Sequence, residues 1–290
     1  MAASARRPRY VGKALASFLL VLFTMPLGHA LMILMEHNMP PGPLHVSAFI
    51  MGLVGVLITV AGVFVRGDLK QTLFGLFGGL LFWTGWVEFL FQYYAARYGM
   101  QPLTDPLTGK VTQPEYLILP ASFGFLVMFL LLYLFSIRSG CNFFNWVQKR
   151  LLGRRRDLVV VKPMTRHTSL VTFMELNLMM WTSYVVLMFC YDTKFLGDTH
   201  PVTILLGLTC LVGAAFIFLK QTRIPSWGAN IRMAIATVLV LWTFVEILGH
   251  IGLLKEIWVD PMNHVLEMSV LLVLFLGLGA YTLWGAFRKR

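Results

Sequence analysis

The chain has 290 residues, of which 58% are hydrophobic and only 13% charged, and its mean hydropathy is +0.73. Ordinary soluble domains are about half apolar and about a quarter charged, so this composition excludes a soluble globular protein. The formal net charge of +11 does not indicate nucleic-acid binding, because the basic residues lie in short segments between apolar runs. The three cysteines have no CxxC spacing and support neither a disulfide framework nor a zinc site.

Eight apolar runs predict an all-α, polytopic membrane protein with eight transmembrane helices. Each run has roughly the 20 residues that a helix needs to cross a ~30 Å hydrocarbon core. Helices are expected because lipid cannot satisfy the open edge of a sheet. The first run follows a basic start but is too long for a signal-peptide core, so we expect it to stay as a helix. The expected spans are residues 14–36, 46–65, 72–95, 117–137, 169–190, 201–219, 233–254 and 265–287.

The distribution of Lys and Arg predicts the orientation of these spans. With both termini inside, the inner segments hold 20 of the 24 Lys and Arg residues, and the outer loops hold four. The positive-inside rule therefore predicts that the N- and C-termini are both cytoplasmic.

The chain also suggests an internal repeat of two four-helix units, residues 1–137 and 168–290, joined by a basic linker over 138–167. Glu88 in WVEFLFQ matches Glu246 in FVEILGH, each near the outer end of the third helix of its unit. An even number of helices per unit would make this a parallel repeat, related by an axis near the membrane normal. The alternative is a chance similarity between apolar helices.

The linker contains the stretch CNFFNWVQKRLLGRRR, in which aromatic and aliphatic residues alternate with basic ones at roughly helical spacing. This pattern predicts an interfacial helix on the anionic inner leaflet. The alternative is a basic loop without secondary structure.

Ionisable residues concentrate in the stretch Trp242–Glu267, which we expect to form two helices around a short turn. Glu246 and His250 are four residues apart on the first helix, and His264 and Glu267 are three apart on the second, so each pair shares a face. Ionisable groups are expensive inside a bilayer and indicate a functional site.

Other ionisable residues gather in the same outer half. His29, Met32 and Glu36 share one face of the first helix, and Glu88 lies near the outer end of the third. Aromatic residues also gather there and predict an interfacial belt. They include Trp83, Trp86, Tyr184, Tyr191 and Trp258.

Three interpretations of this cluster remain open. Glu246, His250, His264 and Glu267 could bind a metal ion, namely iron, copper or zinc, since imidazole and carboxylate suit these metals. His29 and His250 could instead hold haem b from facing helices. The third interpretation is a polar network that fixes the bundle or carries protons.

The preferred function is a metal- or haem-dependent membrane redox protein, or a membrane subunit of a redox complex that has outer-side partners. Its carboxylates Glu88 and Glu246 would act as catalytic, proton-carrying groups. The first alternative is a proton-coupled transporter of a small solute or ion, with Glu88 and Glu246 as a symmetric pair. The second is a non-catalytic assembly subunit. The expected location is a lipid bilayer, the cytoplasmic membrane if the protein is bacterial, and no Walker A, GxGxxG or GxSxG motif indicates a soluble catalytic domain.

Overall fold

The structure is a computed structural model of the whole chain. It describes residues 9–104, 109, 111–112, 117–136, 142–152, 167–192, 194–197 and 199–287. Residues 1–8 and 288–290, with five of the basic residues near the chain ends, and residues 153–166 of the predicted linker lie outside this part.

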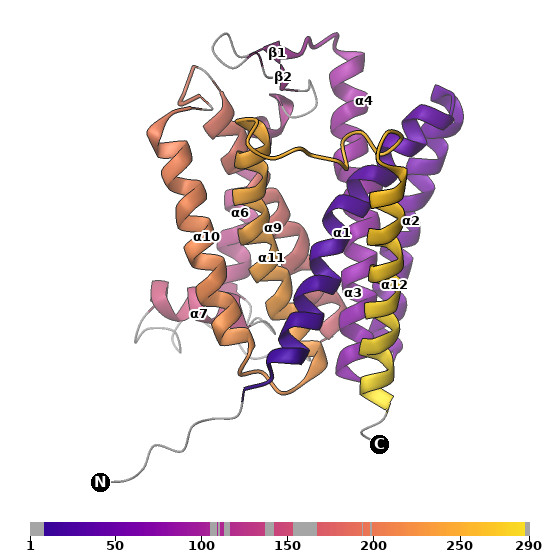
Figure 1. Cartoon of the computed structure of the whole chain (residues 1–290), viewed down its shortest axis with the longest axis vertical. Coiled ribbons are helices and arrows are strands. Elements are labelled where there is room, and N and C mark those ends of the chain that lie inside the picture. The colour runs from indigo at the N-terminus through magenta and orange to yellow at the C-terminus, as the bar shows by residue number, and fades with distance from the viewer. Residues whose placement is uncertain are drawn as a thin grey trace.

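The described residues form a helical bundle with one small hairpin, β1 (Leu103–Thr104) paired antiparallel with β2 (Val111–Thr112). In Figure 1 the helices run roughly parallel to the long axis, with both termini at one end and the hairpin at the other. The first half contains α1 (Val11–Asn38), α2 (Pro41–Phe64), α3 (Asp68–Phe82), η1 (Trp83–Glu88), α4 (Phe89–Arg97), η2 (Leu119–Ser122) and α6 (Phe123–Ser136). The rest comprises α7 (Asn142–Leu152), α9 (Thr168–Tyr191), α10 (Pro201–Gln221), α11 (Trp227–His250) and α12 (Val265–Phe287).

Seven helices in the described part of the chain are long and apolar enough to cross a membrane, which indicates an integral, multi-pass membrane protein. All eight segments expected from the sequence are helical, and α3, η1 and α4 form one continuous span over Asp68–Arg97. The segment expected over 117–137 is the one that is not among these seven helices. It includes the 3-10 turn η2, and its apolar helix is shorter than a membrane span.

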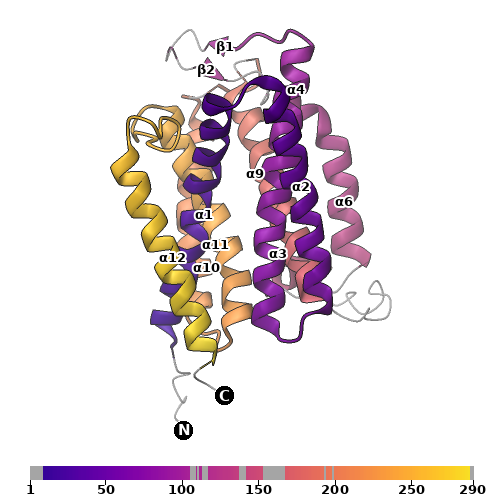
Figure 2. The same cartoon turned by 90° about the vertical axis from the view of Figure 1, so that its right-hand side faces the viewer.

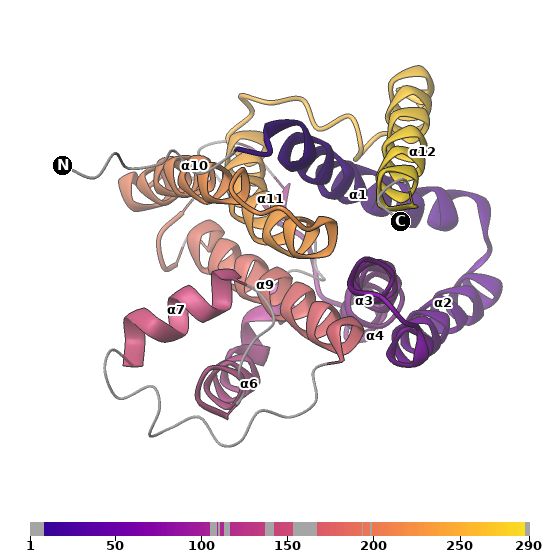
Figure 3. The ribbon, with the colours of Figure 1, turned by 90° about the horizontal axis from the view of Figure 1, so that it is seen from below.

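The long helices form two layers. Figure 3 shows α10, α11, α1 and α12 side by side in one layer, and α6, α9, α3 and α2 in the other. The contacts agree, since α1 packs on α11 and α12, whereas α9 packs on α3 and α6. Figure 2 shows α12 and α6 at opposite edges of the bundle. The first helix of each half therefore lies in the layer that the other half builds.

Small residues allow the closest helix pairs to form. A Cβ added to Gly55 of α2 would lie 2.6 Å from the carbonyl oxygen of Gly78 of α3, and one added to Gly75 would overlap the carbonyl oxygen of Ser169 on α9. Without a hydrophobic drive between helices in lipid, such close backbone approach is a main source of helix association. These glycines thus allow α2, α3 and α9 to pack closely within their layer.

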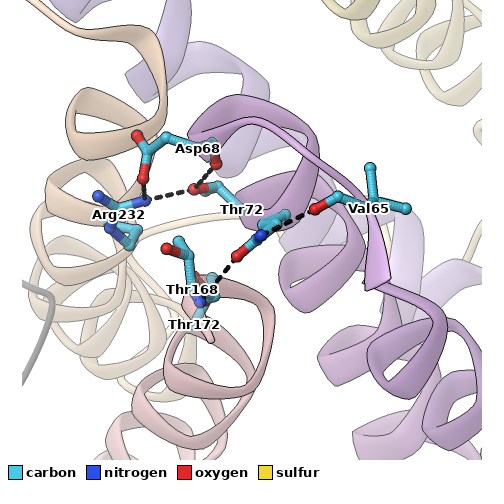
Figure 4. A network of polar contacts seen from close by, with 7 residues as sticks. Val65, Asp68, Thr72, Thr168, Thr172 and Arg232 are labelled. Atoms are coloured by element: carbon cyan, nitrogen blue, oxygen red, sulfur yellow. Dashed lines mark hydrogen bonds and ion pairs between the residues drawn. The ribbon is translucent and has the colours of Figure 1, made fainter. Parts of the chain in front are cut away.

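A polar network joins the two layers near the end that carries the termini (Figure 4). The Arg232 guanidinium on α11 donates to the Asp68 carboxylate at 2.9 Å and also to the hydroxyl of Thr72, both at the start of α3. Within one layer, Gln71 joins α3 to α9, because its amide donates to the carbonyl of Val65 and accepts from the backbone N–H of Thr168.

The predicted short turn before the last helix is wrong. α11 begins at Trp227, six residues earlier than expected, so Arg232 lies within the helix, where it is buried and pairs with Asp68 of α3. It ends at His250, where Gly252 adopts a φ of +79°. The connection over 251–264 then crosses the end of the bundle, and α12 packs on α1 (Figure 1).

Candidate functional site

An open cavity of about 420 Å³ lies at the end of the bundle away from the termini, among α1, the span from α3 to α4, α9 and α11. Six acidic or imidazole side chains line it, and they come from these helices and from the connection after α11. They are His29, Glu36, Glu88, Glu246, His250 and Glu256. The cavity therefore contains four of the six residues predicted for the site, namely His29, Glu88, Glu246 and His250.

One face of α1 forms the first wall. His29, Met32 and Glu36 all line the cavity, as their spacing along the first helix predicts. Met32 is buried, and the Glu36 carboxylate accepts a hydrogen bond of 2.5 Å from the side-chain amide of Gln92 on α4. Glu36 is thus held against the opposite wall.

The second wall contains a π-helix, η1, which interrupts the third span over Trp83–Glu88. Such segments carry one residue more per turn than an α-helix and often occur at functional sites. Glu88 is the last residue of η1, and its Oε1 atom lies 3.7 Å from Nδ1 of His29. The irregular turn therefore places a carboxylate opposite an imidazole of α1.

α11 provides the third wall. The indole N–H of Trp242 donates to Glu246 Oε1 at 2.7 Å, which orients this carboxylate. The ring of His250 stacks on that of Tyr191 from α9, with centroids 3.8 Å apart and an angle of 13° between the planes. Both ionisable groups that α11 contributes to the cavity are therefore fixed by aromatic neighbours.

The sequence did not assign several lining residues to the site, among them Glu256, Tyr184 and Tyr191. Glu256 comes from the connection after α11 and packs on Gly249, where an added Cβ would overlap its carboxylate. Tyr184 and Tyr191 were assigned to an interfacial belt, but both line the cavity. Their spacing of seven residues puts them on one face of α9, and this spacing could have indicated from the sequence that they line one site. Glu256 had no comparable signal, because it lies in an irregular segment.

The other predicted pair lies elsewhere. His264 and Glu267 are close to each other, with Nδ1 and Oε1 3.4 Å apart, but neither lines the cavity, and the Glu267 side chain is 52% exposed. The reason is the long connection over 251–264, which carries the start of α12 across to α1. The structure does not bring together the four predicted metal ligands Glu246, His250, His264 and Glu267. Within the described residues, no group of three or more His, Cys, Asp or Glu side chains is arranged to hold a metal ion.

The electrostatic character of the cavity follows from its lining, which among the described residues includes four carboxylates and no Lys or Arg. Carboxylates close together in a poorly hydrated site repel one another unless a cation or a proton neutralises them. The arrangement is therefore suited to bind a small cation, or protons, from the side on which the cavity opens.

A second, apolar pocket of about 710 Å³ lies on the other side of η1, between the third span, α6 and α9. Trp83 lines this pocket and stacks on Tyr184 of the acidic cavity, with ring centroids 5.7 Å apart. This aromatic pair separates a polar space from an apolar one.

No family model matches the chain, and no curated protein and no solved structure matches it either.

Proposed function

We propose that this protein is a membrane transporter that exchanges a small cation for protons through the acidic cavity. The observation that carries the proposal is the convergence of four carboxylates and two imidazoles on one open cavity, whose described lining residues include no Lys or Arg. Ionisable residues inside a membrane bundle typically mark ion or proton pathways. The cavity volume of about 420 Å³ suits a hydrated ion or a small organic cation better than a bare metal ion held by several ligands.

The finer architecture of the proposal is an eight-span bundle with both termini in the cytoplasm, in the inner membrane if the protein is bacterial. It consists of two four-helix repeats that have exchanged their first helices. The helix contacts support this symmetry, because exchanging α1 with α9, α3 with α11 and α6 with α12 turns the pair α1–α11 into α9–α3 and the pair α1–α12 into α9–α6. Glu88 and Glu246 are then equivalent residues. Transporter sites commonly lie at the interface between such repeats.

On this model the structure represents an outward-open state. The carboxylates are reached from the end opposite the termini, while Leu176, Ile235 and Leu239 are fully or almost fully buried nearer the other end. Rocking of one layer against the other would close the cavity on the outside and open it on the inside. Proton binding to Glu88 and Glu246 would replace the cation during the return step.

Proteoliposomes that contain a pH-sensitive dye test the proposal. An inward gradient of the transported cation, sought among Li⁺, Na⁺, K⁺ and tetramethylammonium, should drive protons out and raise the internal pH. Glu88→Gln and Glu246→Gln should abolish this proton flux. The matched control is Glu267→Gln, which removes the same charge outside the cavity and should leave the flux unchanged. The proposal fails if no cation in the panel moves protons, or if the control loses flux as fully as the cavity variants.

The redox function is the second candidate, and one observation favours it: His29 and His250 line the same cavity. Haem b held by these two imidazoles, or a metal ion, would require electron-donating partner subunits. An absorption spectrum and elemental analysis of the purified protein distinguish the two candidates. A stoichiometric haem or metal that His250→Ala removes would favour the redox function over transport.

A further inference from the structure

A third cavity, independent of the acidic one, lies at the opposite end of the bundle. It has a volume of about 460 Å³ and opens between α7, α10 and α11. Figures 1 and 3 show α7 lying across the bundle at the end where both termini lie. The lining is apolar, with Trp146 and Phe216 among its walls, and Lys220 is the one charged group among its described residues.

The helix α7 separates the bundle from its surroundings at this end. Phe144 and Gln148, four residues apart, are buried, and Phe144 packs edge-on against the ring of Tyr133 on α6. Trp146 and Leu151 are on the outer side, 43% and 63% exposed. An amphipathic helix with this division lies at the boundary between a bundle and the lipid surface.

Two cations share one aromatic ring beside this cavity. The ammonium of Lys220 lies 5.0 Å from the ring centroid of Trp146 and 4.2 Å from that of Phe216, and the guanidinium of Arg150 lies 5.7 Å from Trp146. In the part of the chain that the structure describes, neither cation forms an ion pair with a carboxylate. A positive site thus adjoins an apolar space at the membrane surface.

We propose that this cavity binds an anionic phospholipid of the inner leaflet, with its phosphate at Lys220 and Arg150 and part of an acyl chain between α7 and α10. Charge selects the ligand, because lipid tails gain no hydrophobic energy by moving from the bilayer into a protein groove. Basic pockets of this kind on the cytoplasmic side bind acidic headgroups, and the positive-inside rule predicts that this end is cytoplasmic.

Native mass spectrometry of the full-length protein tests the site. The protein is equilibrated in nanodiscs with equal amounts of phosphatidylglycerol and phosphatidylcholine, then released into detergent, and the retained lipids are counted. Two cations, each contributing about fivefold, should give a preference of about 25-fold for phosphatidylglycerol. Lys220→Gln and Arg150→Gln should each lower the preference about fivefold, and Lys220→Arg should restore it.

Two further variants make the result specific to this cavity. Lys194→Gln removes an exposed cation at the other end of the bundle and should leave the preference unchanged. Gly213→Leu keeps every charge but fills the cavity, and it can be accommodated because the nearest atom to an added Cβ is 3.7 Å away on Val240. It should reduce the retained phosphatidylglycerol severalfold. Equal retention of the two lipids, an equal effect of Lys194→Gln, or full retention in Gly213→Leu would overturn the proposal.

Discussion

The pair formed by Arg232 and Asp68 offers the sharpest test of how the two layers are held together (Figure 4). The two side chains differ in burial: that of Arg232 is 8% exposed and that of Asp68 is 46% exposed. Removing Asp68 therefore leaves a buried guanidinium with fewer partners, whereas removing Arg232 leaves a carboxylate that water can reach. The two single substitutions should not cost the same free energy of unfolding.

The expected values follow from this asymmetry. Breaking a fully buried pair costs about 3–5 kcal/mol and an exposed pair under about 1 kcal/mol, so Asp68→Ala should cost about 2–3 kcal/mol. Arg232→Met fills the buried space with an apolar chain of similar length and should cost at most about 1 kcal/mol. The double variant Asp68→Ala/Arg232→Met should be more stable than Asp68→Ala alone, because it no longer buries an incompletely paired charge.

Reversible unfolding in mixed micelles, with increasing sodium dodecyl sulfate and tryptophan fluorescence as the signal, measures these differences. Arg66→Ala, which removes an exposed charge just before α3, is the control and should change the free energy of unfolding by less than about 0.5 kcal/mol. The reasoning is refuted if Arg232→Met destabilises more than Asp68→Ala, or if the two effects add in the double variant.

Four further substitutions test packing and the cavity. Gly75→Ala should lower the free energy of unfolding by about 1–3 kcal/mol, because its Cβ would overlap the backbone of α9. Gly213→Ala has room for its Cβ and should raise the free energy of unfolding by up to about 1 kcal/mol through helix propensity. In the same unfolding assay, shifts of one sign for both variants would contradict this reasoning. Gly249→Ala should displace Glu256 and lower the affinity of the acidic cavity for cations severalfold, with little loss of stability. Tryptophan fluorescence during a cation titration measures this affinity, and an unchanged affinity would count against a role for Glu256. Tyr133→Phe should cost about 1–2 kcal/mol in unfolding free energy, since its hydroxyl donates at 2.6 Å to a buried carboxylate on α9; a neutral effect would mean that this bond contributes nothing.

The sequence predicts the helices well, because a run of about 20 apolar residues has few alternatives in lipid. It also predicts that His29, Met32 and Glu36 share a face, because helical spacing alone decides that. The π-helix before Glu88 was not predictable, since its extra residue depends on packing against α2 and α9 rather than on composition. The same holds for α12, whose partner depends on the path of a 14-residue connection and not on the apolar pattern of the helix.

The orientation and the repeat stay predictions, because no contact within the bundle distinguishes the two sides of a membrane. Glu246 and Glu267 show the limit of reasoning from adjacency. Both lie on faces that their spacing defines, yet only Glu246 reaches the cavity, because the connection after α11 carries α12 across to α1.

The exchange of first helices between the layers also has a consequence for biosynthesis. α1 is made first, but its main partners α11 and α12 are made last. At about 5–20 residues per second, the 188 residues between the end of α1 and the start of α11 take roughly 10–40 s to synthesise. During that time the face of α1 that carries His29 and Glu36 lacks the wall that α11 later supplies, so the nascent helix must wait beside other protein or near the bilayer surface. A chain cut within the segment between α7 and α9 should therefore yield fragments that are unstable apart and that assemble when they are produced together.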